Sequence, residues 1–185
     1  MLGGTVDGQT VGPRRVVVLG LGNVLMGDDA LGPAAVRTVS ARYEFDPGVS
    51  VIDAGTPGLD LTPFLLGQDA AIVVDTVNAT GAAGEVRLYR SDELRAAPAG
   101  PRLSPHDPGL QEALLLLDLH GNGPRDFLLV GVIPERVERG IGMSEPVRQA
   151  IPEVETVVLA ELDRLGVAAR EKAIPEEPDL WWERT

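Results

Sequence analysis

Residues 15–32, RVVVLGLGNVLMGDDALG, join an apolar run to a loop rich in glycine and aspartate. The run at 15–21 is mostly valine and leucine and ends in glycines, which is typical of a strand buried on both faces of a parallel sheet. The loop that follows would lie at the carboxyl end of this strand, where open α/β sheets bind their ligands. This stretch therefore predicts an α/β fold and the edge of the sheet at which function resides.

Four other segments carry strand patterns. Residues 49–54, 70–77 and 126–133 are continuous apolar runs, and residues 84–90 alternate between apolar and polar side chains, as in a strand with one wet face. Strands that alternate with helices are the signature of parallel βαβ units with helices on both faces of the sheet.

Helical patterns lie between these runs. They span residues 33–43, 58–66 and 107–120, and a last one begins near Ser144 and carries an apolar stripe to Leu165. Pro152 interrupts that stripe, so we expect either a kink or two abutting helices there.

The length of 185 residues fits one domain. Composition predicts a flexible leader at 1–13, a single α/β domain at 14–166 and an acidic C-terminal extension at 167–185. We expect this extension to be loose, with Trp181 and Trp182 either docking back on the domain or serving a partner.

Charge and residue counts exclude several classes of function. The net charge of −12 disfavours binding to nucleic acids and to membrane surfaces. Cysteine is absent, which excludes disulfides, thiolate metal sites and cysteine nucleophiles. The start of the chain lacks the pattern of a signal peptide, and no apolar stretch is long enough to span a membrane, so we predict a cytoplasmic protein.

The glycine-rich loop does not fit dinucleotide binding. After Gly20 and Gly22, the third glycine of GxGxxG would fall at Leu25. Asp28 and Asp29 would also repel a pyrophosphate.

Three further polar residues are predicted at the same edge of the sheet. Asp53 ends the second apolar run, Asp75 ends the third, and His106 stands directly before a helix. Asp29, Asp75 and His106 together offer two carboxylates and one imidazole, enough for a divalent metal with open positions.

Plainer structural roles stay open for each of these residues. A single aspartate at a strand end is more often a cap, and a lone histidine near a helix start is more often a surface residue. Asp53 could simply hold its turn, and Asp28 could face solvent. The only other histidine, His120, is expected in a solvated loop and is given no role.

Five motifs in order along residues 15–166 resemble those of the maturation endopeptidases of [NiFe]-hydrogenases, a family of M52-like peptidases. They are GLGNVLMGDDALGPAAV (20–36), DAGTPG (53–58), IVVDTV (72–77), SPH (104–106) and LLVGVIPE (128–135). The resemblance implies a three-layer α/β/α fold around a mostly parallel twisted sheet.

The resemblance also implies an activity. The family removes a C-terminal extension from the hydrogenase large-subunit precursor once nickel has been inserted. The positions that would sense nickel correspond to Asp29, Asp75 and His106, and Asp29 and Asp53 are the expected catalytic residues. The two glycine-rich loops add predicted substrate-binding residues, which are Gly22, Asn23, Asp28 and Thr56.

In this interpretation Ni²⁺ arrives with the substrate, and the free protein needs no organic cofactor, although an adventitious divalent metal could occupy the same ligands. The expected partner is the large-subunit precursor, and the expected state is a monomer. In one mechanism, nickel would polarise the scissile carbonyl or lower the pKa of a bound water. In the other, nickel would only dock the substrate, and Asp53 or Asp29 would act as general base. A non-catalytic module that checks for nickel on the same fold is the alternative function.

Overall fold

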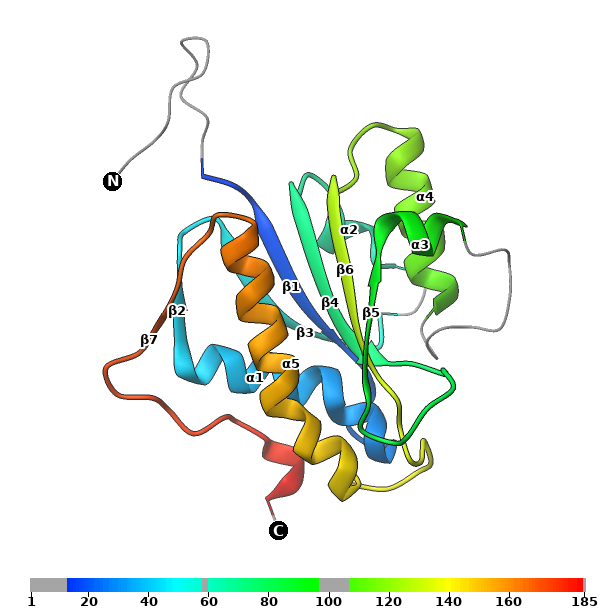
Figure 1. Cartoon of the computed structure of the whole chain (residues 1–185), viewed down its shortest axis with the longest axis vertical. Helices are drawn as coiled ribbons and strands as arrows, with labels where there is room; N and C mark the ends of the chain where they lie inside the picture. The colour runs from blue at the N-terminus through cyan, green and yellow to red at the C-terminus, as the bar shows by residue number, and fades with distance from the viewer. Residues whose placement is uncertain (1–12, 58–59, 97–106, 185) are drawn as a thin grey trace.

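The computed structural model describes residues 13–57, 60–96 and 107–184, and its centre is a five-stranded sheet (Figure 1). The strand order is β3-β1-β4-β6-β5. The strands are β1 (Val16–Leu21), β3 (Val49–Gly55), β4 (Ala70–Thr76), β5 (Val86–Arg90) and β6 (Asp126–Val132). All neighbouring pairs are parallel except β5 with β6. The predicted mostly parallel sheet is confirmed.

Helices cover both faces of this sheet. One face packs against α1 (Leu31–Arg42) and α5 (Glu145–Arg164), and the other packs against the segment of α2 (Thr62–Leu65) and against α4 (Asp107–Leu119). The remaining helix, α3 (Ser91–Ala96), follows β5. The three-layer α/β/α prediction is therefore confirmed.

Alternation along the strands explains why their sequences are apolar throughout. Val16 and Val18 belong to the core beneath α1 and α5, whereas Val17 and Leu19 belong to the core beneath α2 and α4. Successive side chains of a strand point to opposite faces, so in a strand covered on both sides every position is buried and most carry apolar residues.

The helix boundaries differ from the sequence prediction at three places. α1 begins at Leu31, ahead of Pro33. α2 spans four residues, shorter than the predicted 58–66, of which 58 and 59 lie outside the described residues. α5 is one helix that contains Pro152, so the alternative of two abutting helices is wrong. Pro152 is exposed, where its missing N–H leaves a carbonyl that water can reach.

The C-terminal segment is docked, not loose. Its strand β7 (Ala169–Glu171) pairs antiparallel with β2 (Tyr43–Phe45), and neither strand was predicted. Further along, Trp182 is only 4% exposed and joins the core beneath α1 and α5. Figure 1 shows this segment in red running past α1 to the end of the molecule where α5 begins. The predicted leader falls almost wholly on residues 1–12, outside the described residues.

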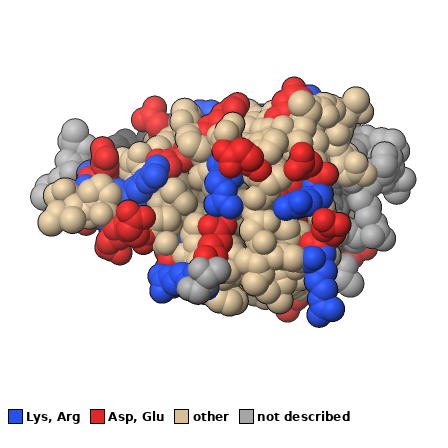
Figure 2. Space-filling view, turned by 90° about the horizontal axis from the view of Figure 1, so that it is seen from below, with Lys and Arg blue, Asp and Glu red and all other residues tan. Residues whose placement is uncertain are grey.

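The face seen in Figure 2 is mixed in charge. Figure 2 views the molecule from below, toward the end at which α5 begins and the chain ends, and shows acidic and basic side chains interspersed with neutral surface. Among the described helices, none has both the length and the hydropathy to cross a bilayer.

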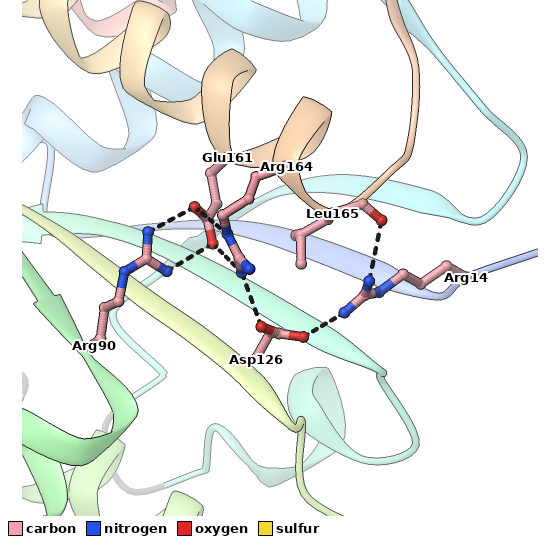
Figure 3. Close-up of polar contacts among 6 residues, drawn as sticks. All are labelled: Arg14, Arg90, Asp126, Glu161, Arg164 and Leu165. Carbon is pink, nitrogen blue, oxygen red and sulfur yellow. Dashed lines mark hydrogen bonds and ion pairs between the residues drawn. The ribbon is translucent and has the colours of Figure 1, made fainter.

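A network of ion pairs joins the far end of α5 to the sheet (Figure 3). Arg90 of β5 binds both carboxylate oxygens of Glu161 at 3.0 and 2.9 Å. Arg164 bridges Glu161 to Asp126 of β6 at 2.8 Å to each, and Arg14 pairs with Asp126 as well. Burial alone would raise the pKa of Glu161, but the hydrogen bonds and charges of Arg90 and Arg164 outweigh it and lower the pKa to about 2.

We predict that Glu161→Gln lowers the free energy of unfolding at pH 7 by about 1–3 kcal/mol, because two arginines lose a charged acceptor. A depressed pKa in the folded state stabilises the protein above the unfolded value of about 4.5, and this contribution disappears as the pH falls toward 2. The difference between wild type and variant should therefore shrink below pH 4.5. Urea denaturation at a series of pH values measures it.

The control is Glu153→Gln, which changes an exposed glutamate on the same helix. A loss in Glu153→Gln as large as that in Glu161→Gln would show that the network is not the cause.

Candidate functional site

The loop after β1 folds back against the start of α1 through contacts between backbones. A Cβ atom on Gly32 would lie 2.1 Å from the carbonyl oxygen of Leu21. Gly22 has a φ of +140°, and a Cβ atom on it would lie 1.8 Å from the carbonyl oxygen of Asp29. Only glycine allows so close an approach. The two aspartates of the short 3-10 helix η1 (Gly27–Ala30) are thereby held against the carboxyl end of the sheet.

Asp28 is a buried anchor between two loops. Its carboxylate accepts hydrogen bonds from the backbone N–H groups of Glu135, Arg136 and Ser144 at 2.8, 2.9 and 2.5 Å, and from the Ser144 hydroxyl at 2.9 Å. The side chain is fully buried, so the alternative that Asp28 faces solvent is wrong. The observed contacts join η1 to the loop before α5, and a role of Asp28 in substrate binding stays a prediction.

Asp29 and Asp75 both accept a hydrogen bond from Thr76. Both aspartates are buried, Asp29 after β1 and Asp75 near the end of the neighbouring β4. The Thr76 hydroxyl donates to Asp29 Oδ1 at 3.0 Å, and the Thr76 backbone N–H donates to Asp75 Oδ1 at 2.7 Å. The other oxygen of Asp29 accepts the N–H of Asn23 at 2.8 Å. Two predicted ligands thus each bond to Thr76, at the carboxyl end of β4.

Asp53 lies at the carboxyl end of the edge strand β3 and is reachable from outside. The side chain is 22% exposed, and Arg37 of α1 donates to Asp53 Oδ2 at 2.8 Å. Asp53 Oδ1 accepts the N–H of Gly55 at 3.2 Å, so the predicted turn-holding role is also present.

A groove of about 260 Å³ opens beside Asp53. Four of the predicted site residues line it together, although they come from two separate loops: Gly22, Asn23, Asp53 and Thr56. Its wall is completed by Val24, Pro33, Arg37, Gly55 and Trp181. None of these five residues was predicted as a site residue.

The third predicted nickel ligand, His106, lies outside the described residues. Within the part of the chain that the structure does describe, no three histidine, aspartate or glutamate side chains form a metal-binding cluster. The donors present at the predicted site are the carboxylates of Asp29 and Asp75, which are hard oxygen ligands suited to a divalent cation. His120 is exposed, as expected.

Three residues of this region escaped the sequence analysis. Thr76 lies within the motif IVVDTV (72–77) but was given no role there, although a hydroxyl beside an acid at a buried strand end is a usable signal. Arg37 carries no such signal, because its partners Asp53 and Asp179 are met only in the folded chain. For Trp181 the sequence indicated only that it docks on the domain or serves a partner, and not that it lines this groove.

Comparison with known proteins identifies the family. The family model described as hydrogenase maturation protease matches residues 33–161, more than half of the chain. The chain belongs to the hydrogenase maturation protease family. The hydrogenase 2 maturation protease of Escherichia coli (strain K12) is 36% identical over 164 residues, which cover 88% of this chain and 97% of that protein.

Other relatives agree with this assignment. The hydrogenase expression/formation protein HoxM of Azotobacter vinelandii is 36% identical over 156 residues, covering 84% of this protease and 75% of HoxM. The solved structure of the hydrogenase maturating endopeptidase HybD from E. coli superimposes with a TM-score of 0.80 at 35% identity, covering 86% of this chain and 98% of that one. The protease is thus a hydrolase, and the family decides between the enzyme and the non-catalytic module in favour of the enzyme.

We predict that Asp28→Asn lowers the free energy of unfolding by about 2–3 kcal/mol, because an amide NH₂ would face donors that now meet a carboxylate. Chemical denaturation measures the loss, with Asp60→Asn, at an exposed aspartate, as the control. Equal stability of the two variants would contradict the assignment of Asp28 as an anchor.

Proposed function

We propose that this protease removes the C-terminal extension of a nickel-loaded [NiFe]-hydrogenase large-subunit precursor. In this proposal Asp29, Asp75 and His106 bind the nickel that the substrate carries. The observation that carries it is the pair of buried carboxylates, Asp29 and Asp75, joined by Thr76 at the carboxyl edge of the sheet. Carboxylate oxygens are hard ligands suited to a divalent cation, so two carboxylates that both bond to Thr76 at this edge support a cation site.

The groove supports a role for Asp53 in the chemical step, separate from nickel binding. Asp29 is buried, whereas Asp53 lines the groove and is partly exposed, so substrate and water can reach it. We assign Asp53 as the general base, which takes a proton from the water that attacks the scissile carbonyl. The proton then passes to the leaving amine as the peptide bond breaks. Arg37 and the Gly55 N–H hold both Asp53 oxygens in place for this step.

Nickel in the substrate would contribute as a Lewis acid near the scissile bond or as the docking point that brings the bond to Asp53. In both cases cleavage requires that the precursor carries nickel. The enzyme would act in the cytoplasm as a monomer, and a divalent metal picked up by the free protein would occupy the same carboxylates.

The decisive experiment is the intact mass of the large-subunit precursor, with and without nickel, after incubation with substoichiometric protease. We expect loss of one C-terminal peptide only from the nickel-loaded precursor. His106→Ala, Asp75→Asn and Asp53→Asn should each abolish this loss, while circular dichroism shows an unchanged fold. Equal cleavage of the nickel-free precursor, or full processing by His106→Ala, would refute nickel recognition by this site.

The contact from Thr76 to Asp29 allows a sharper test. Thr76→Val removes the hydroxyl donor to Asp29 while keeping the side-chain shape. Because hydrogen-bonded partners orient metal ligands, we expect processing to fall by about 10- to 100-fold.

Thr38→Val is the matched control, because Thr38 is also buried and donates only to the Ala34 carbonyl within α1. Both variants should lose about 1 kcal/mol of stability. If both reduced processing equally, stability and not ligand orientation would be the cause.

A further inference from the structure

The C-terminal segment is tied along the end of α1 before it reaches the groove. The N–H of Lys172 donates to the Arg42 carbonyl at 2.8 Å, and the N–H of Glu176 donates to the Ala41 carbonyl at 3.0 Å. Together with the pairing of β7 and β2, these bonds bring residues 179–183 to the same end of the molecule as the candidate site (Figure 1).

Arg37 connects this segment to Asp53. The guanidinium that binds Asp53 also donates from Nη1 to the Asp179 carbonyl at 2.9 Å. The same guanidinium lies 5.4 Å from the ring centroid of the buried Trp182, within the range of a cation–π interaction. One side chain thus holds both the predicted general base and the end of the chain.

Trp181 lies beside this anchor and lines the groove. Its ring meets the Trp182 ring edge to face, with centroids 5.7 Å apart and an interplanar angle of 88°. Yet Trp181 is 54% exposed, and it shares the groove with Asp53 and Thr56. A large indole held in place by a buried neighbour offers contact area at low cost in conformational entropy, as in the aromatic anchors of protein interfaces.

The size of the groove indicates its occupant. Its volume of about 260 Å³ is below the range of roughly 300–1,000 Å³ that is typical of small-molecule pockets. The walls combine two glycines, polar side chains, the apolar Val24 and Pro33, and one aromatic ring. These features suit one or two side chains of an extended peptide that continues past the groove.

We propose that Trp181 is a substrate-binding residue, against which an apolar side chain of the precursor beside the scissile bond packs. This inference rests on the proposed function, since it names the precursor as the peptide in the groove. The C-terminal segment, absent from the motifs that identify the family, would then supply one wall of the substrate site.

The test compares Trp181→Ala with Ile174→Ala, which removes an apolar side chain that is 84% exposed elsewhere in the same segment. Binding of the nickel-loaded precursor is measured by titration calorimetry, and its cleavage is measured by mass under multiple turnover. For Trp181→Ala we expect KM and Kd to rise about tenfold, with kcat within twofold of wild type. Trp181→Phe should recover most of the loss, and Ile174→Ala should match wild type.

The outcomes separate the two proposals. Wild-type KM and Kd in a folded Trp181→Ala variant would overturn the inference even if nickel-gated cleavage is found. If the wild type binds the precursor but does not cleave it, the proposed function fails, while weaker binding by Trp181→Ala still supports Trp181 as a contact. Equal loss in Ile174→Ala would attribute the effect to the segment as a whole and would also overturn the inference.

Discussion

The contact of backbone with backbone between the end of β1 and the start of α1 is the constraint on which the site depends. Gly22 and Gly32 meet carbonyl oxygens where any Cβ atom would collide. Because the chain approaches itself so closely, the short helix η1 is pressed against the carboxyl edge of the sheet and its aspartates are removed from water. A wider loop would leave both carboxylates solvated, with neither the order nor the burial that a cation site requires.

Two adjacent aspartates in that loop have opposite tasks. Asp28 accepts hydrogen bonds from donors in the loop before α5, so it joins distant parts of the chain. Asp29 bonds to different partners, the Thr76 hydroxyl and the Asn23 N–H. Successive residues of a tight turn face different directions, so one acid can stabilise the loop while the next one serves the site.

The groove beside Asp53 depends on Arg37. This side chain is the common partner of Asp53 and of the C-terminal segment, so the position of the proposed base and the docking of Trp182 are coupled. A protease of this family thereby gains a groove wall from residues outside the segment that the family model matches.

The sequence by itself determined the sheet, the helical layers and the edge that carries Asp29, Asp53 and Asp75. These features follow from local patterns, because apolar runs mark doubly covered strands and their carboxyl ends meet at one edge. The extent of α2 and the continuity of α5 through Pro152 were decided by packing. The tertiary structure alone decided that Asp28 is an anchor, that Thr76 joins two carboxylates, and that Arg37 and Trp181 belong to the groove. The physical reason is that Asp28, Asp29 and Arg37 meet partners far apart in the chain, and no local pattern records such a pairing.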